Sequence, residues 1–321
     1  MRLLIHFVAV GSRTKTTKGS NKVKRQFLDH HFIKKSIFIQ ILINYMLAIH
    51  WDVSPEIIDG WKTPNYYGLL FITGLAIGYF VIRRMFKKEN ISEDLLDKLV
   101  LYVVLATIIG ARLGHVIFYG PHFGPEGYFS HPLSILKVWE GGLASHGGAI
   151  AVLIALMIYS KRVSKKPLMW ILDRIVAPVA VAAAFIRLGN LMNSEIVGDP
   201  TNVPWGFEFV KYVNEAGYLE FPVVARHPTQ LYEAIAYLFI FAILLFLFWK
   251  RNAWRRPGML FGIFLILLFS ARFFIEFLKV GQSEFDDTLA INTGQWLSVP
   301  FVLAGIFVLW RAFKKNPLPL E

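Results

Sequence analysis

The sequence predicts an all-α integral membrane protein with about seven transmembrane helices. Hydrophobic residues make up 55% of the 321 residues and charged residues only 17%. The mean hydropathy of +0.49 is well above that of a soluble domain. The apolar residues lie in long blocks separated by short basic clusters, which a single water-facing core does not explain. The chain is long enough for one compact bundle but not for a large second domain.

Seven segments are apolar and long enough to cross a bilayer, which takes roughly 20 helical residues. They are Tyr66–Ile82, Leu99–Tyr119, Leu143–Tyr159, Trp170–Leu191, Leu231–Trp249, Met259–Leu278 and Trp296–Trp310. Two of them carry a G-x-x-x-G pair, Gly74 with Gly78 and Gly110 with Gly114, a spacing that lets helix backbones approach closely. We expect these glycines to mark helix–helix contacts.

Positive charge alternates between the connections. Lysine and arginine cluster after the first, third, fifth and seventh segments, at 83–88, 161–166, 250–256 and 311–315, and the other connections hold few. Cytoplasmic loops are enriched in these residues. We therefore expect the first span to start outside, the C-terminus to be cytoplasmic, and a small extracytoplasmic loop region. Short basic clusters between apolar blocks are typical of the loops of a membrane protein, so the net charge of +12 predicts no nucleic-acid partner.

The N-terminal 45 residues differ from the rest. A polar, basic run extends to Lys35, and the mostly apolar stretch Ser36–Ile49 follows. One interpretation is a signal-like segment or a short extra span with its basic end inside. The interpretation that we favour is a mis-assigned start, with translation beginning at Met46. Residues 46–321 then form a single transmembrane domain.

Several kinds of chemistry are excluded by what the sequence lacks. There is no cysteine, so a protein thiol nucleophile, disulfides and thiolate metal sites are ruled out. No H-E-x-x-H, G-x-S-x-G or P-loop motif is present, which argues against a metalloprotease, a serine hydrolase or an NTPase. We expect neither a metal nor an organic cofactor.

The run I-R-L-G-N-L-M-N-S-E-I-V-G ends the fourth span. Arg187, Asn190 and Asn193 are spaced i, i+3 and i+6 and share one helical face, with Glu195 and Gly198 after them. The planar fork of arginine donors matches phosphate, and the amides suit glycerol or phosphate oxygens. The alternative is an arginine that reaches the headgroups with Glu195 as its ion-pair partner.

Three other segments place ionisable residues at the same depth, where each is costly unless paired or hydrated. His146, between glycines in W-E-G-G-L-A-S-H-G-G, suits proton transfer, or is a structural histidine. Arg272 and Glu276 in the sixth span are spaced i, i+4 and form either part of an anion site or a structural ion pair. Glu233, in R-H-P-T-Q-L-Y-E, is either functional or lies among interfacial anchors. Two arginines from two helices predict a site for a phosphodiester.

These motifs resemble those of the prolipoprotein diacylglyceryl transferase family. They are R-L-G-N-L-M-N-S-E-I-V-G, W-E-G-G-L-A-S-H-G-G, G-A-R-L-G-H-V-I-F-Y, R-H-P-T-Q-L-Y-E and the Arg272/Glu276 pair, in the family's order from about His50 to Trp310. Several separate motifs in order are more specific than one. The resemblance covers nearly all of the chain except its N-terminus.

Two further positions bear on the resemblance. The N-Y-Y-G run resembles an aromatic-Tyr-Gly run at the first span of the family, which makes Tyr67 a candidate active-site residue. Family members often carry a tyrosine four residues before the sixth-span arginine, where this chain has Leu268. Any role of that hydroxyl is absent here or supplied elsewhere.

Family members also begin a few residues before a segment such as I-H-W-D-V-S-P-E-I, which fits a start at Met46.

The resemblance implies a transferase of the bacterial cytoplasmic membrane. Such an enzyme moves a diacylglyceryl group from phosphatidylglycerol to the lipobox cysteine of a preprolipoprotein, on the extracytoplasmic side. It implies that Arg187 and Arg272 hold the leaving phosphate. Asn190 and Glu195 would orient the headgroup or the arginines, and Glu276 would hold Arg272. His146 as the base is a hypothesis.

Two other classes compete with this reading. A transporter for an anionic solute would also place two arginines in a bundle, usually near the midplane and within an internal repeat. A scaffold that binds anionic lipid would explain the arginines. It would not explain His146 together with two glutamates at the same leaflet.

Overall fold

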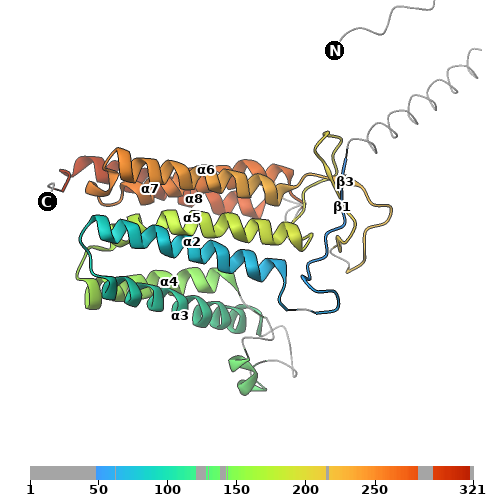
Figure 1. Cartoon of the computed structure of the whole chain (residues 1–321), viewed down its shortest axis with the longest axis horizontal. Coiled ribbons are helices and arrows are strands. Elements are labelled where there is room, and N and C mark those ends of the chain that lie inside the picture. Colours follow the sequence, from blue (N-terminus) through green and yellow to red (C-terminus); the bar gives the residue numbers. More distant parts are fainter. Residues whose placement is uncertain are drawn as a thin grey trace, which may run out of the picture.

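The computed structural model describes residues 48–61, 63–120, 128, 130–137, 142, 144–214, 217–280 and 292–318. The N-terminal extension and the W-E-G-G part of the His146 motif lie largely outside these residues. The described chain forms a bundle of long helices with a small group of strands at one end (Figure 1).

Seven helices are long and apolar enough to span a membrane, which confirms the predicted fold class. They are α2 (Tyr66–Lys88), α3 (Glu93–Phe118), α4 (Ser145–Ile158), α5 (Leu168–Met192), α6 (Thr229–Lys250), α7 (Met259–Ile275) and α8 (Thr293–Lys314). A π-helical turn, η4 (Tyr159–Ser164), extends α4, and short 3-10 turns form η2 (Pro132–Leu136), η5 (Ala253–Arg255) and η6 (Glu276–Leu278). Several helices run past their apolar blocks, because basic side chains extend to the headgroups without breaking the helix.

The helices define two ends of the bundle. The basic end holds the clustered lysines and arginines, such as Lys87, Arg162 and Arg311, and the strand end holds β1 (Ile49–Trp51), β2 (Phe207–Phe209) and β3 (Ala225–Arg226). β1 is parallel to β2, and β2 is antiparallel to β3. The indole of Trp51 donates to the carbonyl of Leu191, 3.1 Å away. The strands therefore cover the end of α5.

The two glycine pairs lie at helix contacts, as predicted. A Cβ on Gly74 or Gly78 of α2 would meet Ala182 or Pro178 of α5, and one on Gly114 of α3 would lie 2.7 Å from Gly147 of α4. A third contact joins Gly262 of α7 to Gly305 of α8. A Cβ added to either glycine would lie 2.9 Å from the carbonyl oxygen of the other. Close backbone approach thus fixes the pairs α2/α5, α3/α4 and α7/α8.

Gly147→Ala is expected to lower the melting temperature, whereas Gly148→Ala is expected to leave it nearly unchanged. A Cβ at Gly147 would lie 2.6 Å from the backbone of Gly114, but one at Gly148 would have its nearest neighbour at 3.6 Å. Backbone cannot move aside as a flexible side chain does, and overpacking typically costs about 1–3 kcal/mol. Thermal melting of the two variants in one detergent checks this. Equal melting temperatures would contradict the close packing of α3 on α4.

The α3/α4 hairpin is anchored to the rest of the bundle at the basic end. The cluster of buried residues that joins it to α2 and α5 includes Leu96 and Leu99 of α3, Leu156 of α4, and Phe86 and Trp170 opposite them. The hairpin residues packed in or against this cluster come from the half of each helix at the basic end. A second buried cluster unites α5, α6 and α7 along their length.

Candidate active site

A network of charged side chains lies at the strand end, between α5 and α6. Arg187 of α5 places its Nε 2.8 Å from Oε2 of Glu233 on α6, an ion pair without the alignment of a directed hydrogen bond. Its Nη1 donates to Oδ1 of Asn190 at 3.2 Å. The Glu233 side chain is fully buried. The carboxylate that pairs with Arg187 is therefore Glu233 and not Glu195, the partner considered from sequence.

Glu195 instead accepts from the two amides that share the face of Arg187. Asn190 Nδ2 lies 2.7 Å and Asn193 Nδ2 3.2 Å from Glu195 Oε1. The predicted shared face is thus present, because Arg187, Asn190, Glu195 and Asn193 form one chain of contacts. Through these contacts the acid holds the amides and the amide of Asn190 holds the guanidinium.

The loop that carries Glu195 has a strained backbone held by the start of α6. Ser194 and Ile196 have positive φ values of 53° and 57°, which is costly for a β-branched residue. The side chain of Thr229 donates to the carbonyl of Ile196 at 2.9 Å, and Gln230 Nε2 donates to the carbonyl of Glu195 at 2.6 Å. Tertiary contacts therefore fix a conformation that local sequence does not favour.

Gly198 lies where this loop meets α6 and the end of α7. Its N–H donates to the carbonyl of His227 at 2.9 Å, and it bridges to Lys279. A Cβ would lie 2.7 Å from the Thr229 methyl group, so only glycine fits without displacement. Arg226 donates to the Gly198 carbonyl at 3.1 Å, and the paired Glu220 carboxylate raises the pKa of Arg226. Gly198 thus contributes to the site through close backbone packing.

The expected pairing of Arg272 with Glu276 is not formed. Glu276 Oε2 lies 3.3 Å from Lys279 Nζ, which also lies 3.1 Å from Glu233 Oε1. The reason is local: α7 ends at Ile275, and Glu276 begins a 3-10 turn, where residues three apart come together. The hydroxyl of Tyr237 donates to Glu233 Oε1 at 3.2 Å.

Sequence reasoning missed two members of this network. In the sequence, Lys279 directly follows the sixth predicted span as one of the few basic residues of its connection, and its spacing of three from Glu276 suits a 3-10 turn. Tyr237 lies one helical turn after Glu233, the acid whose role the sequence left open. The buried Lys279 links Glu233 of α6 to Glu276 of η6.

Arg272 is the cation that remains available. Within the residues described by the structure, its half-buried guanidinium makes no ion pair or hydrogen bond, whereas Arg187 and Lys279 are both paired. The Tyr237 hydroxyl lies within electrostatic range of both Arg187 and Arg272. The guanidinium groups of Arg187 on α5 and Arg272 on α7 are therefore both near the Tyr237 hydroxyl.

Tyr67 adjoins the network from α2. A Cβ on Gly189 would lie 2.7 Å from Tyr67 Cδ2, so the ring packs directly on the α5 backbone. The hydroxyl is within electrostatic range of Glu195 and Arg187. Tyr67 thus packs on α5 beside the Arg187–Asn190–Glu195 chain.

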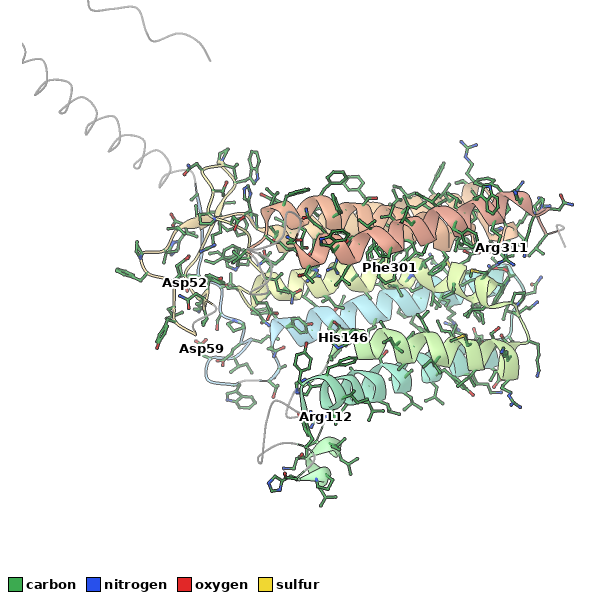
Figure 2. All side chains as sticks on the ribbon, turned by 180° about the vertical axis from the view of Figure 1, so that it is seen from behind. Asp52, Asp59, Arg112, His146, Phe301 and Arg311 are labelled. Carbon is green, nitrogen blue, oxygen red and sulfur yellow. The ribbon has the colours of Figure 1, made fainter. Side chains whose placement is uncertain are left out.

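His146 lies at the same end but in the α3/α4 hairpin. Its exposed ring meets Phe118 edge-on with centroids 4.8 Å apart, and Tyr119 at 6.2 Å. In the described part of the chain its ring contacts come from α3 and not from the Arg187 network. Figure 2 shows His146 and Arg112 toward the end that carries Asp52 and Asp59, with Arg311 at the other end. The candidate base and the candidate phosphate site are thus on separate parts of the bundle.

Arg112 organises the connection that leads to His146, a role the sequence analysis did not assign. Its Nε donates to the carbonyl of Ile135 at 2.9 Å, and its Nη1 to the carbonyl of Gly142 at 3.2 Å. The guanidinium is nearly inaccessible and also stacks on Tyr128. The arginine of G-A-R-L-G-H therefore clamps the α3–α4 connection onto α3.

The network is balanced in charge and suited to an anion. The region holds three cations, Arg187, Arg272 and Lys279, and three carboxylates, Glu195, Glu233 and Glu276. Among the described residues, no group of three or more histidine, aspartate and glutamate side chains is placed to hold a metal ion. What the side chains offer is a guanidinium pair for a phosphate group and amides for neighbouring oxygens.

Comparisons with known proteins identify the family to which the chain belongs. The family model described as prolipoprotein diacylglyceryl transferase matches residues 58–311. A phosphatidylglycerol–prolipoprotein diacylglyceryl transferase of Porphyromonas gingivalis is 44% identical over 277 residues, covering 84% of this chain and 96% of the relative. Transferases of the same name from Tolumonas auensis and Chloroherpeton thalassium are 42% and 41% identical, with 99% and 96% of the relative covered and 84% of this chain in each case. The chain is therefore a transferase that belongs to the prolipoprotein diacylglyceryl transferase family.

Proposed function

We propose that the protein transfers the diacylglyceryl group of phosphatidylglycerol to the lipobox cysteine of preprolipoproteins. The thiolate sulfur attacks the glycerol carbon that bears the phosphate, the carbon–oxygen bond breaks, and glycerol phosphate leaves as a thioether forms. This is the first step of bacterial lipoprotein maturation. The relatives' names supply both substrate classes.

The observation that carries the proposal is the pair of guanidinium groups at the strand end. Arg187 is fixed by Glu233 and Asn190, and Arg272 is unpaired in the described chain. The reaction converts a phosphodiester into a phosphate monoester, so negative charge develops on the leaving oxygen. Preorganised cations at that position lower the barrier. Asn190, Asn193 and Glu195 orient the headgroup or the arginines, and Gly198 keeps their loop packed.

A transfer assay tests the function. Purified protein in lipid is given phosphatidylglycerol and a peptide with a lipobox cysteine, and a Cys→Ser peptide is the control. The expected result is a cysteine-dependent gain of one diacylglyceryl mass. A folded, lipid-supplied protein that shows no transfer would refute the proposal, and anion flux would then be measured to test a transporter.

His146→Gln is expected to slow transfer by about a hundredfold or more, the usual contribution of a general base. A thiol with a pKa of about 8.5 is mostly protonated at neutral pH, and a base raises the thiolate fraction. In this role His146 would lie within hydrogen-bond reach of the thiol, which the lipobox peptide would bring between the α3/α4 hairpin and the phosphate site. The assay is repeated with the variant at pH 7 and pH 9. Full activity of His146→Gln at pH 7 would exclude His146 as the base.

We also propose that residues 46–321 form a catalytic domain of the bacterial cytoplasmic (inner) membrane with its active site extracytoplasmic. The basic end would be cytoplasmic by the charge rule. Because the chain has no cysteine, a single introduced cysteine is the one site in the purified protein that a maleimide can label. In intact cells, Thr63→Cys near the strand end is expected to react with a membrane-impermeant maleimide, and Lys315→Cys only after lysis. The reverse labelling pattern would show that the protein has the opposite orientation in the membrane.

A further inference from the structure

A cavity of about 270 Å³ lies at the basic end, away from the candidate active site. It is where α2 turns into α3, at the left of Figure 1. Its lining residues are Lys88–Ile91, Lys166, Pro167, Trp170, Trp254, Pro257 and Leu318. Small-molecule pockets begin at roughly this size, so the cavity suits a small polar group.

The cavity wall has a net positive charge. Its one acid, Glu89, is bound by Arg174, with Nε 2.9 Å from Oε1 and Nη2 2.5 Å from Oε2, and by the Trp170 indole at 3.1 Å from Oε2. The Arg174 side chain is completely buried. An internal partner thus neutralises the acid, and Lys88 and Lys166 remain as the uncompensated charges of the lining.

Both lysines lie over aromatic rings, and the ring under Lys88 is open to the apolar surface. Lys166 Nζ lies 5.7 Å from the Trp170 ring centroid, and Lys88 Nζ 5.4 Å from that of Trp249 on α6. The Trp249 side chain is exposed on the outside of a membrane span. Tryptophan at the end of a span marks the depth of the lipid headgroups.

We propose that this cavity binds the phosphate headgroup of an anionic phospholipid from the leaflet at the basic end. Two cations at headgroup depth attract an anionic lipid. A lipid is favoured over a soluble phosphate because Lys88 lies over a ring that is open to the membrane, so acyl chains can remain along α6. The inference does not depend on the transfer reaction, since none of these residues belongs to the candidate active site.

The bound lipid stabilises the basic end of the bundle. The cavity wall joins the α2–α3 turn, the start of α5 and the segment before α7. A ligand that binds only the folded arrangement of these elements shifts the equilibrium toward that fold. Melting temperature should therefore rise with anionic lipid.

The experiment counts lipids retained by delipidated protein after addition of phosphatidic acid, by native mass spectrometry. Phosphatidic acid lacks the glycerol leaving group, so no turnover complicates the count. Lys88→Gln/Lys166→Gln is compared with Lys87→Gln/Lys161→Gln, which makes the same charge change at exposed positions outside the lining. The lining variant is expected to lose one bound lipid, with at least a tenfold weaker affinity, because each basic residue contributes roughly fivefold.

The outcomes separate the possible ligands. Loss in the lining variant alone, with retention in Lys88→Arg/Lys166→Arg, supports the proposal. Equal loss in both double variants would show non-specific surface attraction and overturn it. Displacement of the lipid by millimolar inorganic phosphate would overturn the proposal that the ligand is a lipid and would indicate that the cavity binds a soluble anion. Transfer activity, measured in parallel, distinguishes a failure of this site from a failure of the proposed function.

Discussion

Replacing Arg187 by alanine is expected to lower the rate of diacylglyceryl transfer by about a hundredfold to a thousandfold. That is the usual cost of removing one charge-stabilising donor from a transition state. The side chain is fixed by Glu233 at 2.8 Å and by Asn190 at 3.2 Å, so little reorganisation is needed when charge develops on the phosphate. Initial rates of the purified variant in the transfer assay, with its fold checked by thermal melting, measure the effect.

Arg187→Lys separates geometry from charge. Lysine keeps the positive charge but loses the planar fork, so we expect it to retain little activity, with no recovery at low salt. The matched control is Arg83→Lys, because Arg83 is also ion-paired, with Glu93 at 2.7 Å, but on the exposed surface. Near-normal activity of Arg187→Lys, with a strong salt dependence, would contradict the phosphate-fork role and favour loose lipid attraction.

Glu233→Gln is expected to destabilise the protein by about 3–5 kcal/mol, the usual cost of breaking a buried ion pair by removing one partner. Glu233 is fully buried and touches Arg187, Lys279 and Tyr237. The amide is neutral, so the buried Lys279 and the partly buried Arg187 lose a counter-charge, and the position of Arg187 is no longer fixed. We expect a large fall in melting temperature together with reduced transfer.

A second substitution tests this explanation. In Glu233→Gln/Lys279→Met one cation is removed with the acid, so part of the stability is expected to return, although transfer stays low because Arg187 is still released. Glu93→Gln, which breaks the exposed Arg83 pair, is the control and should cost under about 1 kcal/mol. Additive losses in the double variant would show that Lys279 and Glu233 are not coupled.

Much of the fold was predictable because the membrane imposes simple rules. Span length and apolarity follow from bilayer thickness, and all seven predicted spans are present. The shared face of Arg187, Asn190 and Asn193 was also predictable, since it depends on helical periodicity alone. The glycine contacts followed from the need for close backbone approach.

The partners of the charged residues could not be derived from local spacing. Glu233 pairs with Arg187 across two helices, and Lys279 reaches it from the turn after α7. Both contacts depend on how α5, α6 and α7 pack, which sequence periodicity does not specify. The Arg272–Glu276 pairing failed for a different reason: it assumed a continuous helix where the structure has a 3-10 turn.

The α3/α4 hairpin is packed on the rest of the bundle at one end, so the surrounding lipid helps to determine the position of its other end. The hairpin carries His146 at the end opposite its buried contacts with α2 and α5. The basic end of the hairpin is held by these contacts, whereas the end that carries His146 is free to respond to bilayer thickness and lateral pressure. We therefore expect the distance between His146 and the two guanidinium groups to depend on the thickness of the bilayer that surrounds the protein.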